Sequence, residues 1–238
     1  MPFVPVLHAE WIKIRTLPSL RGALAAVLVT TVVFSALASA DADGRGSDAL
    51  FSVFSGISFG QVAAIAFGTT AVASEFRGGA LRLTLAAVPD RGRWFAAKAT
   101  AIALPTLAVG LLTGFVTLLV GRAVLGGSAP GWAEGVRGAV GCGLHLTLMA
   151  LFAAGLTVVL RSGVATLSVL IPFVLIVSFV IGDMSGGVAD FLPDRAGQVA
   201  LHSDWDGTLG PGSGLLVTAL WSAGALLAGG WTLRHRDA

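Results

Sequence analysis

The sequence predicts an all-α membrane protein with six transmembrane helices. Of its residues, 55% are hydrophobic and only 12% are charged, and its mean hydropathy is +0.86. Ordinary soluble domains carry roughly a quarter charged residues. Apolar runs of about 20 residues recur along the chain, and that is the length an α-helix needs to cross the hydrocarbon core of a bilayer.

Six segments are expected to span the membrane, because each one is free of Asp, Glu, Lys and Arg over its whole length. They are residues 22–40, 51–73, 99–121, 138–160, 164–181 and 215–233. Together with their loops they form one transmembrane domain, 22–238, preceded by a separate N-terminal segment, 1–21. The first span ends in Ala38-Ser39-Ala40, which resembles a signal-peptidase site, so cleavage there is the alternative to a retained span.

The basic residues divide unequally between the two sides of this arrangement. Eleven fall on the side of the termini, and four fall on the other side. Because loops rich in Lys and Arg stay on the cytoplasmic side, we expect both termini to be cytoplasmic. The eleven are Lys13, Arg15, Arg21, Arg77, Arg82, Arg91, Arg93, Lys98, Arg161, Arg234 and Arg236, and the four are Arg45, Arg122, Arg137 and Arg195.

The N-terminal segment is expected to form an amphipathic helix that lies in the membrane interface. Its apolar residues Val4, Leu7, Trp11 and Ile14 recur at helical spacing. Trp is typical of the depth of the lipid headgroups, and such a helix lies on a membrane without crossing it. The alternative is an unstructured cytoplasmic tail.

The polar loop from Ser74 to Lys98 connects the second and third spans and contains a short helix of its own. Gly78-Gly79 and Pro89-Asp90 are typical of chain breaks and turns, which leaves residues 80–88 for about two helical turns. Leu81, Leu85 and Val88 recur at i, i+4 and i+7 and share one face. We expect this apolar face to dock into a groove on a soluble partner.

The pattern Glu75-Phe76-Arg77-x-Gly79, followed by Leu81, Thr84-Leu85, Pro89-x-Arg91 and Ala97-Lys98, resembles the first cytoplasmic loop of ABC-2-type transporter permeases. Ala80 departs from that pattern, because relatives often carry Thr there. The resemblance implies that the loop holds the coupling helix, which receives motion from an ATPase subunit. The implied coupling residues are Glu75, Phe76, Arg77, Gly79, Leu81, Arg82, Leu85, Pro89 and Arg91, and the implied N-terminal interface residues are Glu10, Trp11, Lys13 and Arg15.

The resemblance implies a permease subunit of an ATP-driven exporter in a bacterial cytoplasmic membrane. Two copies of a cytoplasmic ABC ATPase and a second or related permease would be its partners, with ATP and Mg²⁺ bound in the ATPase. An apolar pathway fits a drug, a peptide or a lipid, and a drug substrate would imply antibiotic resistance. The alternatives are an ATPase-independent immunity or sensor protein and an intramembrane enzyme.

Several other chemistries lack their sequence signatures. The chain has no G-x-x-x-x-G-K-[ST] phosphate-binding loop, and its four His residues lack the spacing of metal ligands. No catalytic residues are expected. A net charge of +2 is too small to indicate nucleic-acid binding, and the single cysteine, Cys142, excludes an internal disulfide.

Two features inside the spans remain open to two interpretations each. Small residues recur every four positions at Gly56, Gly60, Ala64 and Gly68, which favours close helix packing, either within the bundle or at a dimer or pathway seam. Gln61 and His145 are polar groups at membrane depth. Such groups either hydrogen-bond neighbouring helices or line a transport pathway.

Overall fold

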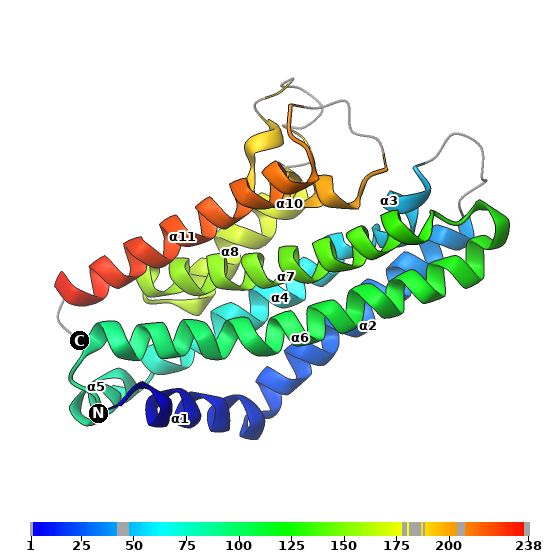
Figure 1. The fold of residues 1–238 in the computed structure, drawn as a ribbon. Coiled ribbons are helices and arrows are strands. Elements are labelled where there is room, and N and C mark those ends of the chain that lie inside the picture. The colour runs from blue at the N-terminus through cyan, green and yellow to red at the C-terminus, as the bar shows by residue number, and fades with distance from the viewer. Residues whose placement is uncertain are drawn as a thin grey trace.

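The computed structural model describes residues 2–41, 48–177, 180, 187, 189–203 and 208–235, which form an elongated bundle of helices (Figure 1). No strand occurs among these residues. The all-α fold class predicted from the sequence is therefore confirmed for the part of the chain that is described.

Five helices are long and apolar enough to cross a membrane. At 1.5 Å per residue, about 20 residues span the 30 Å hydrocarbon core. The prediction of several helices long and apolar enough to cross a membrane is thus confirmed, whereas the count of six stays a prediction. The five are α2 (Pro18–Asp41), α4 (Ile57–Ala73, extended by the 3₁₀ turn η1, Ser74–Phe76), α6 (Arg91–Leu125, followed by η2, Gly126–Ser128), α7 (Trp132–Leu160) and α11 (Pro211–His235).

The segment expected to span at 164–181 is described only in part. It begins as α8 (Gly163–Pro172) and continues as a π-helical turn, η3 (Phe173–Val177), and this apolar helix is shorter than the other five. Pro172 lacks a backbone N–H, which disturbs the regular hydrogen-bond ladder at the point where the π turn begins. The expected end at Ile181 lies outside the described residues.

The second expected span, 51–73, is not one helix. It divides into α3 (Ala49–Phe54) and α4, with a break at Ser55-Gly56. The break lies against α2, where the Gly56 N–H donates to the Ser35 hydroxyl over 3.0 Å. A Cβ on Gly56 would lie 2.2 Å from the carbonyl oxygen of Thr31, so only glycine allows the two backbones to approach this closely.

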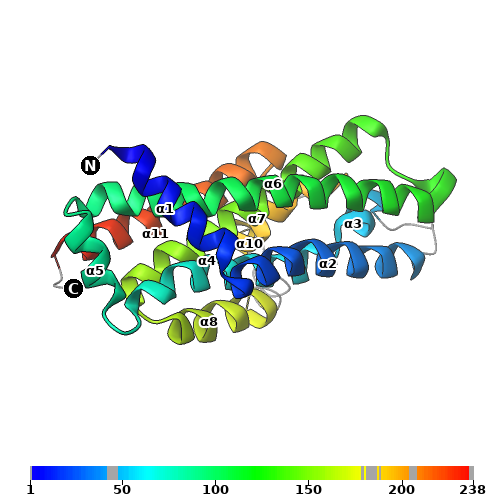
Figure 2. The same cartoon turned by 90° about the horizontal axis from the view of Figure 1, so that it is seen from below.

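Helix α7 forms the centre of the bundle. It packs against α4, α6 and α11, and α2 packs against α4 and α6 on the far side (Figures 1 and 2). In the most apolar 18 residues of α7, 67% of the residues are buried inside the bundle. In the corresponding stretches of α2 and α11 only 22% are buried, so these two helices are mostly exposed. Close approach depends on small residues, since a Cβ on Gly68 would lie 2.1 Å from the carbonyl oxygen of Ala150 in α7.

The two ends of the bundle carry different elements. The α5 end holds α1 (Phe3–Thr16), α5 (Ala80–Ala87), the start of α6 and the end of α11, and both chain termini lie there (Figure 1). The α3 end holds α3, the start of α7, and the short elements η4 (Ala189–Phe191), α10 (Pro193–Gln198) and η5 (Val199–Leu201). Pro193-Asp194 is typical of a helix start, and the sequence predicts a short helix from there to Trp205. Its described part is formed by α10 and η5, and Trp205 itself lies outside the described residues.

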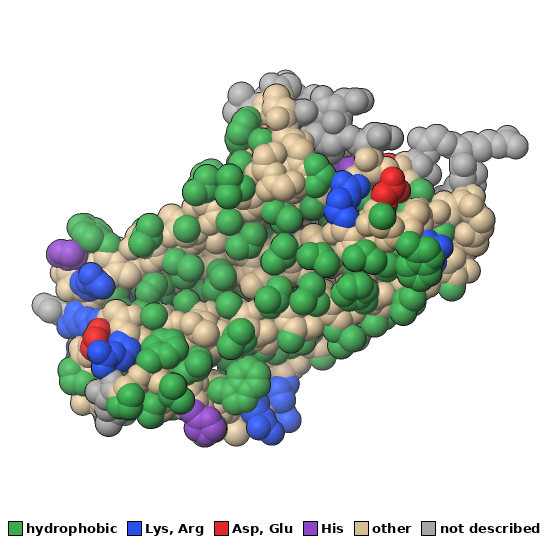
Figure 3. Space-filling model, in the orientation of Figure 1, with side chains coloured by type: hydrophobic (Ala, Val, Ile, Leu, Met, Phe, Trp, Pro, Cys, Tyr) green, Lys and Arg blue, Asp and Glu red, His purple; other side chains and the backbone are tan. Residues whose placement is uncertain are grey.

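Charged side chains gather near the ends of the molecule, and the middle of the face drawn in Figure 3 is covered by hydrophobic side chains. Exposed apolar residues such as Leu119, Leu220 and Leu227 lie along the helices between the ends. A contiguous exposed apolar surface is what a bilayer covers in a membrane protein.

Candidate functional site

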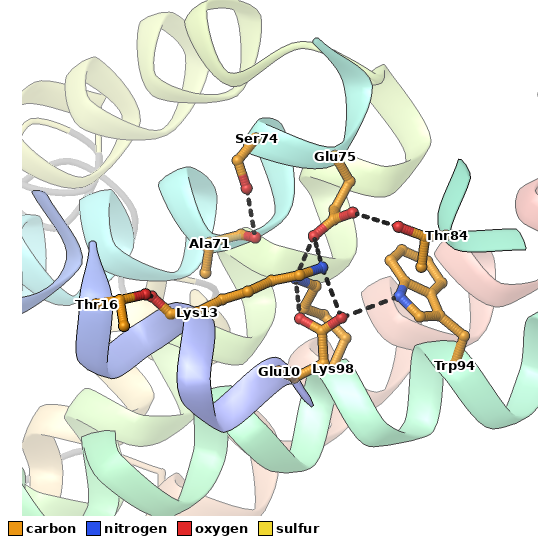
Figure 4. Close-up of polar contacts among 9 residues, drawn as sticks. All are labelled: Glu10, Lys13, Thr16, Ala71, Ser74, Glu75, Thr84, Trp94 and Lys98. Atoms are coloured by element: carbon orange, nitrogen blue, oxygen red, sulfur yellow. Dashed lines mark hydrogen bonds and ion pairs between the residues drawn. The ribbon is translucent and has the colours of Figure 1, made fainter. Parts of the chain in front are cut away.

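Four charged side chains at the α5 end form a closed ring of ion pairs, shown in Figure 4. Lys13 Nζ lies 2.9 Å from Glu10 Oε1 and 2.8 Å from Glu75 Oε1. Lys98 Nζ lies 2.7 Å from Glu75 Oε1 and also pairs with Glu10 Oε2. Because each lysine touches both glutamates, the charges alternate around the ring and sum to zero. We call these four residues the ionic ring.

Three separate elements supply the ring. Glu10 and Lys13 lie one turn apart on α1, so both point to the side on which α1 packs against α6. Glu75 lies in η1, the turn that ends α4, and Lys98 lies two turns inside α6. The ring therefore fastens the N-terminal helix to the ends of two long helices.

Two neutral donors complete the polar contacts of the ring. Trp94 Nε1 donates to Glu10 Oε1 over 3.3 Å, and the Thr84 hydroxyl donates to Glu75 Oε2 over 3.2 Å. Trp94 is fully buried, and the Lys98 ammonium lies 5.9 Å from the centre of the Trp94 indole. Since Thr84 belongs to α5, the short helix is joined to the ring as well.

Burial makes these contacts important to the fold. The side chains of Glu10, Glu75 and Lys98 are only 3–4% exposed, whereas that of Lys13 is 38% exposed. A buried charge without a partner is costly, so each of the three depends on its neighbours in the ring. Burial alone would lower the pKa of Lys13, but the hydrogen bonds and charges of Glu75 and Glu10 outweigh it and raise that pKa above 10.5.

Helix α5 packs its apolar face onto the bundle, which differs from the arrangement expected from the sequence. Leu81 is 5% exposed, and Leu85 and Val88 pack against the main hydrophobic core. The face expected to meet a partner thus packs against the chain itself, with Leu81 buried and Leu85 and Val88 half-buried. Gly78 and Gly79 have φ of 61° and 76°, left-handed values that turn the chain so that α5 folds back.

The remaining coupling residues predicted from the sequence are spread over the α5 end. Phe76 packs against the core, and Arg77 and Pro89 are exposed. Arg91 donates to the carbonyl oxygen of Leu233 over 2.7 Å and so binds the last turn of α11. The carboxylate of Glu75 pairs with the two lysines of the ring.

A pocket of about 370 Å³ lies beside the start of α5. Arg82, the remaining predicted coupling residue, lines it together with Arg161 from the turn between α7 and α8. The other lining residues are Glu75, Phe76, Gly79 and Leu81.

In the N-terminal set, Glu10 and Lys13 belong to the ring, whereas Trp11 and Arg15 do not. The Trp11 side chain is half-buried, and Arg15 is exposed in the last turn of α1. The sequence therefore predicted a helix here but did not separate its buried ionic contacts from its surface residues.

The polar and small residues inside the spans are engaged within the chain. Gln61 Oε1 and His145 Nε2 are 3.0 Å apart and fully enclosed, and this pair joins α4 to α7. A Cβ on Gly197 of α10 would lie 2.1 Å from His145 Nδ1, so α10 covers the imidazole directly. Along the small-residue stripe, Gly60 meets Thr31 of α2, and Ala64 is fully buried.

The α3 end has a polar cluster of its own around Asp48. Its carboxylate caps α3 by accepting the N–H groups of Leu50 and Phe51, and it also accepts from His202 Nδ1 and the Ser203 N–H, each over 3.0 Å. Burial opposes ionisation of Asp48, but these backbone hydrogen bonds outweigh it and hold its pKa below the usual value. Burial lowers the pKa of His202 despite the neighbouring carboxylate.

Comparison with known proteins finds no family model that matches the chain and no curated protein that is similar to it. Among the described residues, no group of three or more His, Cys, Asp or Glu side chains is placed to hold a metal ion.

Proposed function

We propose that the chain is the transmembrane permease subunit of an ATP-driven ABC-2-type exporter. The observation that carries this proposal is the ionic ring, which joins α1 and α5 to the ends of α4 and α6. A force applied to the short elements at the α5 end reaches two long helices through these contacts. The resemblance of the loop from Glu75 to Lys98 to that of ABC-2-type permeases supplies the class of partner.

The ring suits the transfer of motion because its members are costly to separate. Withdrawing one charge from a buried ion pair typically costs about 3–5 kcal/mol. The elements that share the ring therefore move together in preference to sliding apart. Since α4 and α6 both pack against the central helix α7, their displacement changes the packing of the whole bundle.

In this proposal, two cytoplasmic ABC ATPase subunits bind the α5 end, and ATP and Mg²⁺ are held there and not in this chain. The permease works with a second copy of itself or a related chain in a bacterial cytoplasmic membrane, with both termini in the cytoplasm. ATP-driven closure of the ATPases shifts the bundle between two states, and only a ligand that binds those states differently is transported.

The proposed substrate is hydrophobic or amphipathic. A groove of about 470 Å³ between α2 and α4 at the α3 end supports this class. Most of the described part of its wall is apolar, with the rings of Phe34 and Phe59 stacked 4.0 Å apart, and Asp41 adds a charged side chain. Pockets of this size and composition accommodate drug-sized or lipid-like molecules.

The test is a pulldown of the tagged protein from its native membranes in mild detergent, followed by an ATPase assay on the eluate. We expect an ATPase with a P-loop to be recovered, with activity that depends on Mg²⁺. A stable, folded protein that retains no ATPase would overturn the proposal and favour a sensor or immunity protein.

A further inference from the structure

The first turn of α6 and the last turn of α11 lie against each other at the α5 end, and each is contacted by an arginine of the other. Arg91 of α6 donates to the carbonyl oxygen of Leu233 over 2.7 Å. In the opposite direction, the guanidinium of Arg234 reaches α6, because a Cβ on Gly92 would lie 3.0 Å from one of its nitrogens. The two arginines therefore cross between the helices, and neither of these contacts neutralises a charge.

Positive charge accumulates where these two turns meet. Arg93 and Arg234 are both exposed, and the guanidinium of Arg93 lies 3.4 Å from the carboxylate of Asp90. The hydrogen bond from the Arg93 N–H and the charges of Arg93 and Arg234 hold the pKa of Asp90 below its usual value. With Arg91, the set holds three arginines and one aspartate, a surplus of two positive charges. The bias of basic residues towards one side of a membrane explains their number but not their convergence from two distant segments.

An exposed apolar face of α11 runs up to these charges. Leu227 and Trp231 are 75% and 62% exposed, and with His235 they recur every four residues, so the three share one face. The 25 residues of α11 are about 37 Å long, more than the hydrocarbon core of about 30 Å, so its last turn reaches the headgroups. Trp is typical of that depth. In Figure 3, hydrophobic side chains cover α11 and basic side chains gather at its end.

We propose that Arg93, Arg234 and Trp231 bind a phospholipid with an anionic headgroup. Guanidinium groups bind phosphate oxygens through paired hydrogen bonds, so the two exposed arginines hold the headgroup. Trp231 lies beside the glycerol backbone, and an acyl chain follows the apolar face past Leu227. The bound headgroup offsets the surplus positive charge and keeps the first turn of α6 against the last turn of α11. The site is separate from the ionic ring, and the proposal does not depend on an ATPase.

Free phosphate and an acidic soluble protein are the competing occupants, because either would match the charges. The position of Trp231 and Leu227 favours lipid. Both side chains are exposed next to the arginines, and an amphipathic molecule covers an apolar and a charged surface together, whereas free phosphate covers only the charged one. The apolar face also continues along α11 to Leu220, which is 64% exposed, as a surface in contact with a bilayer does.

The test uses the tagged, full-length protein in phosphatidylcholine nanodiscs without any ATPase. Trace phosphatidylglycerol with a photoactivatable acyl chain is added, or phosphatidylcholine with the same chain, and the labelled peptides of α11 are measured by mass spectrometry. We expect phosphatidylglycerol to label α11 at least about fivefold more strongly, because one basic side chain near an anionic lipid contributes about that factor in binding. Arg93→Gln and Arg234→Gln should each reduce this labelling about fivefold. Arg234→Lys keeps the charge and should retain most of it.

The matched control is Arg21→Gln, which removes an exposed arginine from the start of α2, a helix that packs against α4 and α6, and should leave the labelling of α11 unchanged. Equal labelling by the two probes would show ordinary bilayer contact and overturn the proposal. Loss of labelling in an excess of inorganic phosphate would overturn it in favour of a site for free anions. Unchanged labelling in Arg93→Gln and Arg234→Gln would also overturn it. None of these outcomes bears on the proposed function, which is tested by the recovery of an ATPase.

Discussion

Glu75 gives the sharpest prediction, because its carboxylate touches both lysines of the ionic ring and also accepts the hydrogen bond that joins α5 to the ring. The substitution Glu75→Gln keeps the size of the side chain and its hydrogen bond from Thr84 but removes the negative charge. Lys98, only 4% exposed, then keeps Glu10 as its single counter-ion. The ring changes from neutral to a net charge of +1 in a site from which water is largely excluded.

The magnitude follows from the exposure of the two lysines. Leaving a buried ion without a partner costs about 3–5 kcal/mol. Lys13 is 38% exposed and can turn to solvent when Glu75 loses its charge. We therefore expect Glu75→Gln to lower the free energy of unfolding by about 3 kcal/mol, the lower end of this range. Lys13→Met should cost less, about 1 kcal/mol, because water already screens its charge.

The assay is equilibrium unfolding in mixed micelles, followed by tryptophan fluorescence, since Trp94 donates a hydrogen bond to Glu10 of the ring. The double variant Glu75→Gln/Lys98→Gln restores the neutrality of the ring. Its loss of free energy of unfolding should therefore be about 2 kcal/mol smaller than the summed losses of the two single variants. Asp90→Asn is the control, because it removes an exposed ion pair with Arg93 but preserves the cap of α6.

Two outcomes would refute this reasoning. If Glu75→Gln is as stable as the wild type, no buried charge of the ring depends on the negative charge of Glu75. Alternatively, strictly additive effects of Glu75→Gln and Lys98→Gln would show that the two side chains act independently. Asp90→Asn should cause no measurable change in either case.

Two further predictions concern packing and pH. Gly68→Ala should lower the free energy of unfolding by about 2 kcal/mol, because its Cβ would lie 2.1 Å from the carbonyl oxygen of Ala150. The control is Gly224→Ala, whose Cβ would meet nothing within 4 Å and which should raise the free energy of unfolding by about 0.5 kcal/mol in the same assay. Burial lowers the pKa of His202 in the folded protein, so on acidification the unfolded chain takes up the proton first. The stability that the neutral imidazole gives is therefore present above pH 6.5 and is lost as the pH falls through the lowered pKa. His202→Gln should remove this part of the decline in a pH series of unfolding curves, and an unchanged decline would contradict the assignment of this pH dependence to the burial of His202.

The long helices were predictable because hydropathy reports directly on membrane-spanning length. Their ends were not, since α6 begins at Arg91 and includes charged residues that the expected span at 99–121 left out. Lys98 stays in the helix because it has buried counter-ions. The break at Gly56 was hidden for a similar reason, because it depends on the approach of α2 and on no local signal.

The candidate site was predictable only in outline. Periodicity placed Leu81, Leu85 and Val88 on one face of a short helix, but it could not show that the face turns towards the bundle. The ring joins Glu10 to Lys98 across 88 residues, and such a contact has no signature in a single sequence. One signal was present: Glu10 and Lys13 are spaced as an i, i+3 pair on a helix with an apolar face.

The central claim is that the ionic ring transmits motion from the ATPase to the membrane helices. It can be tested by measuring the distance between spin labels at Leu37→Cys on α2 and Leu216→Cys on α11, both exposed, in the complex with its ATPase. Cys142 is buried, so the introduced thiols are labelled selectively. We predict that trapping ATP changes this distance in the wild type but not in Glu75→Gln/Lys98→Gln with the ATPase still bound. An unchanged distance in the wild type, or an equal change in the variant, would contradict the account.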